Sequence, residues 1–415
     1  VLPVVREAVA ALAPAPWLML NRAGDGALPV FDDELDAVRG DPLPDAQMPD
    51  APCVFIYTSG TTGFPKGVMH AQRALILAGE GFVARMHLQP DDRLLCILPM
   101  FHINALFYSL AGALAAGATL ILVPRFSAST FWHDAARSRA TEANTIAAVS
   151  NILLRRPRSE FVPGHSLRKV YGAPFTAETY DVFEREFGVP TLIEGYGMSE
   201  IPGALNNPFE GPHKVGSMGK PSLHPDPAVQ LAQLKVVDDD GRERPDGEVG
   251  ELVVKTPLVM QGYYRDAEQT RAAFRDGWFL TGDLARRDAD GYFWFVARKK
   301  DIIRKRGENI SGAELDRVVE SHPRVLQAAA IPVPDALGED EILIAVVPKA
   351  GASVTPHEVA DWCRQHLAAI KVPRYVVIVD SLPLTPTLRV AKYQMRSDTS
   401  LRTRATDLAS ARSPG

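Results

Sequence analysis

Residues 57–67 bring hydroxyl side chains, glycines and a lysine into one short stretch, Tyr-Thr-Ser-Gly-Thr-Thr-Gly-Phe-Pro-Lys-Gly. Glycines let a backbone approach an anion closely, hydroxyl and N–H groups donate to phosphate oxygens, and a lysine adds a positive charge. The apolar run at 53–56 just before it predicts a short buried strand. We therefore predict a polyphosphate-binding loop. Its predicted ligands are Thr58, Ser59, Gly60, Thr61, Thr62, Gly63 and Lys66.

Two other interpretations of this loop fit less well. The P-loop of nucleotide hydrolases needs Gly, four residues and then Gly-Lys-Ser/Thr. Here Pro65 precedes Lys66, and Gly67 stands where that motif has Ser or Thr. An ordinary surface turn rich in glycine and threonine is the simpler alternative, but eleven consecutive residues of this character behind a strand argue against it.

A second chemical motif is Glu-Gly-Tyr-Gly-Met-Ser-Glu at 194–200. Tyr196 offers an aromatic face to a base, Ser199 can donate to a phosphate, and Glu200 is a hard oxygen ligand suited to Mg²⁺. The motif is not a dinucleotide-binding fingerprint, because Glu200 replaces its third glycine. It also lacks the final glycine of a nucleophile elbow, so Ser199 is a poor candidate nucleophile.

A third motif, Gly-Trp-Phe-Leu-Thr-Gly-Asp at 277–283, places a carboxylate after a turn, where it could accept both hydroxyls of a ribose. In this order the three motifs resemble those of the adenylate-forming superfamily: acyl-CoA synthetases, beetle luciferases and peptide-synthetase adenylation domains. The resemblance covers about residues 50–396. The wording Arg-Gly-Glu-Asn-Ile-Ser at 306–311 resembles the crotonobetaine/carnitine–CoA ligase-like branch.

The resemblance implies an ATP-dependent acyl-CoA synthetase that adenylates a carboxylic acid and then transfers the acyl group to coenzyme A, with Mg²⁺ on Glu200. It implies catalytic roles for Lys66, Ser199, Glu200 and Arg389, and a ribose contact for Asp283 and Arg298. It places Lys300 at an interdomain hinge. Further nucleotide contacts are expected at Gly172, Ala173, Pro174, Glu194, Gly195, Tyr196, Gly197 and Met198. His102 and Asn104 would line the acyl pocket, and Arg304, Lys305, Arg306 and Gly307 would face coenzyme A.

The last motif departs from the family pattern Pro-x-Thr-x-x-Gly-Lys. This sequence reads Pro-Leu-Thr-Pro-Thr-Leu-Arg at 383–389, so Leu388 replaces the glycine and Arg389 the lysine. Arg keeps the charge, but its planar fork is not equivalent to an ammonium. Three interpretations are open: Arg389 does the work of the lysine, Lys392 reaches in instead, or adenylation is slow. We favour the first.

The order of apolar runs predicts an α/β fold. Strands alternating with helices from about residue 94 to 187 predict a mostly parallel sheet with helices on its faces, including a strand at 145–149. We expect a large adenylation domain at 1–299, β-rich from about 225, and a mobile C-terminal α+β domain at 300–396. Residues 397–415 are expected to be disordered. The family carries a longer segment before the phosphate loop, so we expect its N-terminal segment to be absent here.

Composition limits the alternatives. A chain of 415 residues with 46% hydrophobic and 23% charged residues is typical of globular proteins, and a net charge of −5 gives no basic footprint for nucleic acid. We expect reduced cysteines and no membrane span. We also expect a cytoplasmic location, a role in fatty acid metabolism and, as one option, a homodimer. An enzyme that loads a carrier-protein thiol and an impaired homologue both remain as alternatives. The sequence does not identify the acid.

Overall fold

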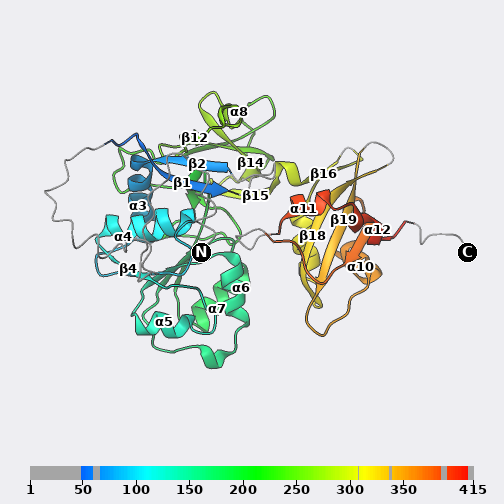
Figure 1. The fold of residues 1–415 in the computed structure, drawn as a ribbon, viewed down its shortest axis with the longest axis horizontal. Coiled ribbons are helices and arrows are strands. Elements are labelled where there is room, and N and C mark those ends of the chain that lie inside the picture. The colour runs from blue at the N-terminus through cyan, green and yellow to red at the C-terminus, as the bar shows by residue number, and fades with distance from the viewer. Residues whose placement is uncertain (1–47, 59–65, 307, 336–338, 385–389, 410–415) are drawn as a thin grey trace, which may run out of the picture. The chain divides into compact units, whose positions relative to one another are not determined.

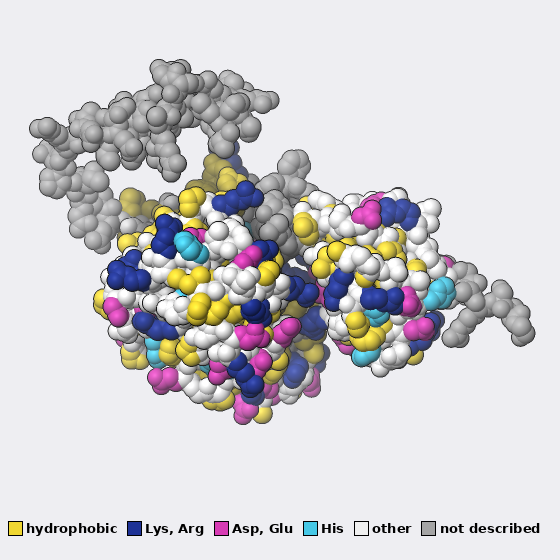
Figure 2. All heavy atoms as spheres, turned by 90° about the horizontal axis from the view of Figure 1, so that it is seen from below, with side chains coloured by type: hydrophobic (Ala, Val, Ile, Leu, Met, Phe, Trp, Pro, Cys, Tyr) yellow, Lys and Arg dark blue, Asp and Glu magenta, His cyan; other side chains and the backbone are white. Residues whose placement is uncertain are grey.

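The computed structural model describes residues 48–58, 66–306, 308–335, 339–384 and 390–409 (Figure 1). Among them, residues 49–299 contain three sheets and residues 300–409 contain a four-stranded sheet and a hairpin. No helix in these ranges is both long and apolar enough to cross a bilayer. On the face shown in Figure 2, basic, acidic and apolar side chains are interspersed.

A seven-stranded sheet forms the main layer of residues 93–221, in the order β4–β3–β5–β6–β7–β8–β9. The strands from β4 to β7 pair in parallel, whereas β8 and β9 pair antiparallel. The mostly parallel α/β prediction is therefore confirmed. The strands are β3 (Arg93–Cys96), β4 (Thr119–Leu122), β5 (Glu142–Asn144), β6 (Lys169–Gly172), β7 (Thr191–Met198), β8 (Ile201–Asn206) and β9 (Lys220–Pro221).

Helices connect the parallel strands, as the alternating pattern predicts. These helices are η1 (Asn104–Leu110, a π-helix), α4 (Ala111–Ala116), α5 (Phe131–Arg137), α6 (Ala147–Arg155), η2 (Arg158–Glu160) and α7 (Ala177–Arg185). The strand predicted at 145–149 was wrong, because residues 147–149 begin α6 and the strand is the preceding Glu142–Asn144. A short apolar run suits a buried strand or a buried helix equally, and here the helix buries Val149 and Leu153.

The strands that flank the phosphate loop belong to a separate antiparallel sheet of β1 (Pro52–Thr58), β2 (Lys66–Ala71) and β12 (Gly262–Tyr263). The strand expected at 53–56 is confirmed as part of β1, but its expected burial was wrong, because only Ile56 is buried and Phe55 is 43% exposed. The helix α3 (Gln72–Met86) follows β2 directly. Val68 and His70 point into the core as alternate residues of a strand do.

Residues 229–298 are antiparallel strands with one short helix. The strands are β10 (Gln233–Val237), β11 (Gly250–Lys255), β13 (Phe274–Arg275), β14 (Trp278–Arg287) and β15 (Phe293–Arg298), and the helix is α8 (Ala267–Ala272). The strand order is β10–β11–β14–β13, with β15 also paired to β14. This pairing brings Asp283 of β14 directly opposite Arg298 of β15.

Residues 299–409 contain a four-stranded sheet in the order β18–β19–β20–β21, together with several helices. The elements are η3 (Lys299–Asp301), β16 (Ile302–Lys305), β17 (Glu308–Ser311), α9 (Gly312–Glu320), β18 (Val325–Pro334), β19 (Asp340–Pro348), α10 (Pro356–His366), η4 (Ala369–Lys371), β20 (Tyr375–Ile378), α11 (Lys392–Ser397), α12 (Thr399–Arg404) and β21 (Thr406–Asp407). The disorder expected from 397 was wrong up to residue 409. Leu401 is buried, and Asp407 forms an ion pair with Arg374, so this segment packs onto β20.

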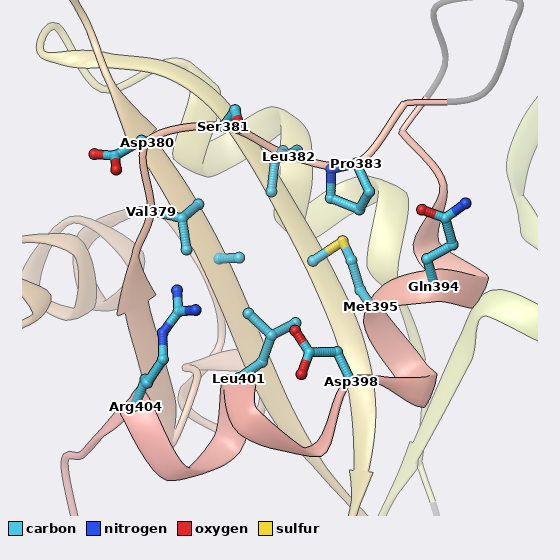
Figure 3. Close-up of a pocket in the computed structure, with 11 residues that line it drawn as sticks. Val379, Asp380, Ser381, Leu382, Pro383, Gln394, Met395, Asp398, Leu401 and Arg404 are labelled. Carbon is cyan, nitrogen blue, oxygen red and sulfur yellow. The ribbon is translucent and has the colours of Figure 1, made fainter.

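A cavity of about 420 Å³ lies beside α11 and α12 (Figure 3). The amide of Ala391 donates to the carbonyl of Pro383 at 2.7 Å, which closes the base of the segment that carries Arg389. The cavity wall includes Pro383 at one end and Arg404 at the other. Residues 385–389, and Arg389 with them, lie outside the described ranges.

Candidate active site

Lys66 is the first residue of β2 and pairs across the β1–β2 hairpin with Thr58. The predicted ligands from Ser59 to Gly63 lie between these strands, outside the described residues. The Lys66 amine donates to the side-chain carbonyl of Gln269 in α8. It also lies 4.9 Å from the centre of the Tyr263 ring, within the range of a cation–π contact. The lysine is therefore held by groups from a segment about 200 residues further along the chain.

The motif at 194–200 forms β7 and the turn into β8, so Ser199 and Glu200 lie at the tip of a hairpin. His70 of β2 is fully buried, and its Nε2 donates to the carbonyl of Ser199 at 2.6 Å. Burial lowers the pKa of His70, which favours the neutral ring. The amide of Met260 donates to the carbonyl of Glu200 at 2.8 Å. The hairpin tip is thus fixed from two sides, and one of them is the strand that begins with Lys66.

Glu200 is 8% exposed and accepts a 2.9 Å hydrogen bond from the Tyr263 hydroxyl at Oε1. Among the described residues, no cluster of three or more His, Cys, Asp or Glu side chains could enclose a metal ion. Mg²⁺ commonly uses one or two carboxylates together with substrate phosphates. A single buried carboxylate with one oxygen still available fits that mode of binding.

Tyr196, Asp283 and Arg298 meet although they come from β7, β14 and β15. The Tyr196 hydroxyl donates to Oδ2 of Asp283 at 2.6 Å, and Nε of Arg298 lies 2.7 Å from Oδ1 of Asp283. The Asp283 carboxylate is buried. Burial and the Asp283 charge raise the pKa of Tyr196, so the hydroxyl keeps its proton. The three side chains predicted to contact the nucleoside therefore form one group, joined by a hydrogen bond and an ion pair.

Glu194 is placed differently from the other residues of its motif. Its Oε1 accepts from the amide of Phe175 at 2.7 Å, and its Oε2 accepts from the Tyr180 hydroxyl and the Gly216 amide, both at 3.1 Å. Burial raises its pKa. Glu194 accepts three hydrogen bonds within the protein, so it fixes the segment after Gly172, Ala173 and Pro174.

Two glycines of the motif are required by packing. A Cβ on Gly195 would lie 2.2 Å from the Tyr171 hydroxyl, and one on Gly197 would lie 2.6 Å from the backbone nitrogen of Gly203. These neighbours are protein atoms, so the glycines permit close packing of β7 against β6 and β8. Met198 is the last residue of β7 and pairs with Ile201.

The two predicted acyl-pocket residues follow β3. The His102 amide donates to the carbonyl of Pro99 at 2.9 Å, and the His102 ring contacts Phe101. Asn104 begins the π-helix η1, and its side-chain oxygen is buried without a hydrogen-bond partner among the described residues. π-Helical turns are often found at functional sites. Asn104 therefore offers a buried polar atom in the same π-helix as Phe107, and the Phe107 ring contacts the ring of His70.

The predicted coenzyme A segment forms the β16–β17 hairpin. Arg304 and Arg306 are exposed there, and Gly307 lies outside the described residues. Lys305 does not match the expectation, because its side chain is buried and its amine forms an ion pair with Glu341 at 2.5 Å. Alternate strand residues point to opposite faces, so only two of the three basic side chains are available at the surface.

Lys300 lies in η3 between two anchored neighbours. Lys299 forms ion pairs with Asp239 at 2.8 Å and Glu251 at 3.0 Å. Asp301 forms an ion pair with Arg396 at 2.8 Å. Burial lowers the pKa of Lys300, and the charge of Arg298 adds to the effect.

Lys392, the alternative to Arg389, is already engaged. Its amine forms a 2.5 Å ion pair with Asp316, and the two side chains are 15% and 19% exposed. Moving Lys392 to a substrate would leave a buried carboxylate without its partner, which is costly. The arrangement therefore argues against Lys392 as the cation that reaches the substrate.

Four residues of this region were missed from the sequence: His70, Arg85, Tyr263 and Gln269. Each acts through a contact with a distant segment, such as the 2.9 Å bond from Tyr263 to Glu200. Arg85 is buried and donates to the carbonyl of Gly203 at 3.0 Å, which ties α3 to β8. The only local sign in the sequence was a polar residue within an apolar run, such as His in Val-Met-His at 68–70.

Comparison with known proteins identifies the family. Residues 7–264 match the model of the AMP-binding enzyme family, and residues 314–388 match the C-terminal domain of AMP-binding enzymes. Sulfoacetate–CoA ligase of Cupriavidus necator is 38% identical over 395 residues, which cover 94% of this chain and 75% of that protein. Crotonobetaine/carnitine–CoA ligase of Citrobacter koseri is 31% identical, over 82% of this chain and 66% of that protein.

A solved structure extends the likeness. The anthranilate–CoA ligase AuaEII in complex with anthranoyl-AMP superposes with a TM-score of 0.85 at 25% identity, covering 97% of this chain and 77% of that one. The chain belongs to the AMP-binding enzyme family. The predicted class is confirmed as an AMP-forming acid–thiol ligase that uses ATP, Mg²⁺ and coenzyme A, with the fold of the adenylate-forming superfamily.

Proposed function

We propose that this enzyme joins a carboxylic acid to ATP through the residues described above, releases pyrophosphate and passes the acyl group to coenzyme A. The first step forms a bond between a carboxylate oxygen and the α-phosphorus and breaks the bond to pyrophosphate. The second step forms the thioester and releases AMP, while the thiol proton goes to solvent. Bound Mg²⁺ would neutralise phosphate charge during the first step.

The residues of this chain would mainly bring anions together. Lys66 supplies a cation at the end of the phosphate loop, and Glu200 supplies the carboxylate for the metal. Tyr196, Asp283 and Arg298 would hold the nucleoside, with Asp283 accepting ribose hydroxyls. Catalysis of this kind depends on positioning and on charge neutralisation, with no covalent bond to the protein.

One observation carries this proposal. Lys66, Glu200 and the Tyr196–Asp283–Arg298 group come from distant parts of the sequence, yet His70 and Tyr263 tie the first two segments together by hydrogen bonds and a ring contact. A binding protein for a nucleoside alone would need neither a lysine nor a metal carboxylate beside it. The combination suits a nucleoside triphosphate whose α-phosphate reacts.

We further propose Arg389 as the cation that meets the acid and the α-phosphate, because Lys392 is paired with Asp316. Coenzyme A is favoured over a carrier protein as the acceptor, since the relatives are named as CoA ligases. The exposed Arg304 and Arg306 would meet its phosphates. We also propose that the enzyme is cytoplasmic and acts in fatty acid metabolism. That it forms a homodimer stays a prediction.

The test is ATP–pyrophosphate exchange against a panel of acids, followed by thioester formation with coenzyme A. The panel should include sulfoacetate, a trimethylammonium acid and anthranilate, taken from the relatives' names, together with fatty acids of several lengths. Exchange with one class of acid and a thioester only when coenzyme A is present would support the proposal. A thioester on an added carrier protein but not on coenzyme A would contradict the acceptor, and absence of exchange with every acid would contradict adenylation.

A further inference from the structure

Two opposite charges of the proposed site contact one aromatic ring. The Lys66 amine lies 4.9 Å from the centroid of Tyr263, and the Tyr263 hydroxyl donates to Glu200 at 2.9 Å. Among the ion pairs of the described residues there is none between Lys66 and Glu200. The lysine is therefore on the face of the ring, the carboxylate is at its hydroxyl, and the two charges do not meet.

This separation matters because a direct ion pair would occupy both groups. Attraction between a lysine and a glutamate is strong in a half-buried setting, and a close pair would compete with phosphate oxygens for the amine and with Mg²⁺ for the carboxylate. An aromatic face attracts the ammonium without neutralising it. A phenol hydroxyl satisfies one carboxylate oxygen and leaves the other for a metal, as the outer partners of metal ligands commonly do.

The Tyr263 ring is itself held firmly. Tyr263 pairs with Val68 of β2, two residues after Lys66, and its amide donates to the Thr270 hydroxyl at 2.9 Å. Gly262 has φ of 143°, and a Cβ there would lie 2.8 Å from the Thr270 side chain, so this position requires glycine. The Gln269 carbonyl accepts the Lys66 amine from the same segment. Residues 262–269 thus supply both described contacts of the Lys66 amine, from Gln269 and from the Tyr263 ring.

We propose that Tyr263 is a positioning residue of the adenylation site, which keeps Lys66 and Glu200 close together but unpaired. Lys66 then remains available to phosphate oxygens, and Glu200 keeps an oxygen for Mg²⁺. The inference rests on the proposed roles of these two residues. It adds a residue that touches neither nucleotide nor metal and acts through the orientation of both groups.

Three variants separate the two contributions of the ring. Tyr263→Phe removes the hydroxyl and keeps the aromatic face, whereas Tyr263→Leu removes both. Tyr264→Phe is the matched control, because Tyr264 is 46% exposed and packs edge-on against Phe55 with ring centres 5.2 Å apart. Each variant is assayed by ATP–pyrophosphate exchange at varied Mg²⁺, and by calorimetric titration with ATP with and without Mg²⁺.

Tyr263→Phe is expected to raise the Mg²⁺ concentration for half-maximal exchange by about tenfold, while the KM for the acid stays unchanged. In calorimetry it should reduce the gain in ATP affinity that Mg²⁺ provides. Tyr263→Leu should show the same Mg²⁺ effect and also a several-fold higher KM for ATP at saturating Mg²⁺, since Lys66 can then pair with Glu200. Tyr264→Phe should match the wild type.

An unchanged Mg²⁺ dependence in Tyr263→Phe would overturn the inference. So would an equal shift in Tyr264→Phe, or a parallel loss of every parameter together with a lower melting temperature. Lys66→Ala and Glu200→Gln, run alongside, keep this outcome apart from the proposed function. If those two retain full exchange, the assigned site fails; if they lose exchange while Tyr263→Phe behaves as wild type, only the role of Tyr263 fails.

Discussion

Asp283 organises the nucleoside side of the site through two contacts. Arg298 balances its charge at 2.7 Å, and Tyr196 donates to its other oxygen at 2.6 Å. A buried carboxylate is costly without such partners, so the three side chains depend on one another for position. The protonated Tyr196 hydroxyl donates to the carboxylate, and this hydrogen bond orients the tyrosine ring. A bound ribose would meet a group that is already aligned.

Asp283→Asn is therefore expected to lower kcat/KM for ATP by roughly 30- to 150-fold, which corresponds to the loss of a charge-assisted hydrogen bond worth about 2–3 kcal/mol. The KM for the acid should change little, and steady-state kinetics with each substrate varied in turn measures both. Asp288→Asn is the control, because Asp288 accepts from Lys214 and Trp294 away from the site. Equal losses in the two variants would contradict a specific role for Asp283.

Arg389 and Lys392 can be separated by activity and stability. Arg389→Ala should abolish ATP–pyrophosphate exchange, and Arg389→Lys should retain a part of it because the charge is kept. Lys392→Met should retain exchange but lower the free energy of unfolding by about 3 kcal/mol, since Asp316 loses its partner. Urea unfolding measures that change. Loss of exchange in a fully stable Lys392→Met, with exchange intact in Arg389→Ala, would reverse the assignment.

Strand β5 carries a carboxyl group in an unusual environment. Glu142 is fully buried, and neither carboxylate oxygen has a hydrogen-bond partner among the described residues. Burial raises the pKa of Glu142 well above its usual range; Lys169 opposes the shift and Asp92 adds to it. The folded protein therefore holds the proton that the unfolded chain releases. Stability is fully present below the unfolded pKa and declines as pH rises toward the folded pKa.

Glu142→Gln should remove this decline. The free energy of unfolding of the variant minus that of the wild type is expected to grow by about 1.4 kcal/mol per pH unit from mildly acidic to neutral pH. Urea unfolding at a series of pH values measures the difference. Glu184→Gln, at an exposed position of α7, should show no such trend. A constant difference for Glu142→Gln at all pH values would contradict the argument.

Much of the element order was predictable because alternating apolar runs reflect the parallel sheet directly. The errors fell where local pattern is ambiguous. The run at 145–149 is apolar enough for a strand, yet the strand is Glu142–Asn144. Its polar residues are buried by tertiary contacts such as the 2.9 Å bond from Asn144 to Ser109. The tail was predicted as disordered from composition, but a few contacts to β20 order it as far as residue 409.

The site was predictable to the extent that its chemistry lies in contiguous motifs. Tyr196, Asp283 and Arg298 were each predicted, and the structure brings them together. Tyr263 and Gln269 could not be found in this way, because their role exists only through contacts with residues at distances of 63 and 203 along the chain. Lys305 shows the opposite failure, since a basic run does not reveal which side chain points inward.

At the scale of the whole molecule, η3 joins the N-terminal and C-terminal parts of the chain, and ion pairs hold the residues on both sides of Lys300. Lys299 is tied to Asp239 and Glu251, and Asp301 is tied to Arg396. Lys300 is the residue between these anchors, so a change in its backbone angles would move the C-terminal residues relative to the N-terminal ones. This supports Lys300 as the proposed pivot between the two half-reactions.

Lys300→Pro should uncouple the two half-reactions, because proline fixes φ near −65°. One half-reaction is expected to persist while the other falls sharply, depending on which arrangement the proline permits. Pyrophosphate exchange reports the first, and thioester formation from supplied acyl adenylate reports the second. Lys300→Ala is the control, since it removes the side chain but leaves the backbone free. Near-normal rates in both assays, or a parallel fall in both, would contradict a pivot at this residue.

The central claim is that the acid is activated by attack of its carboxylate on the α-phosphorus of ATP. The most direct measurement uses an acid labelled with ¹⁸O in both carboxyl oxygens and mass spectrometry of the products. Adenylation followed by thiolysis breaks the acyl C–O bond, so the account predicts one ¹⁸O atom in AMP and none in pyrophosphate. Label in inorganic phosphate, or unlabelled AMP alongside a labelled thioester, would contradict it.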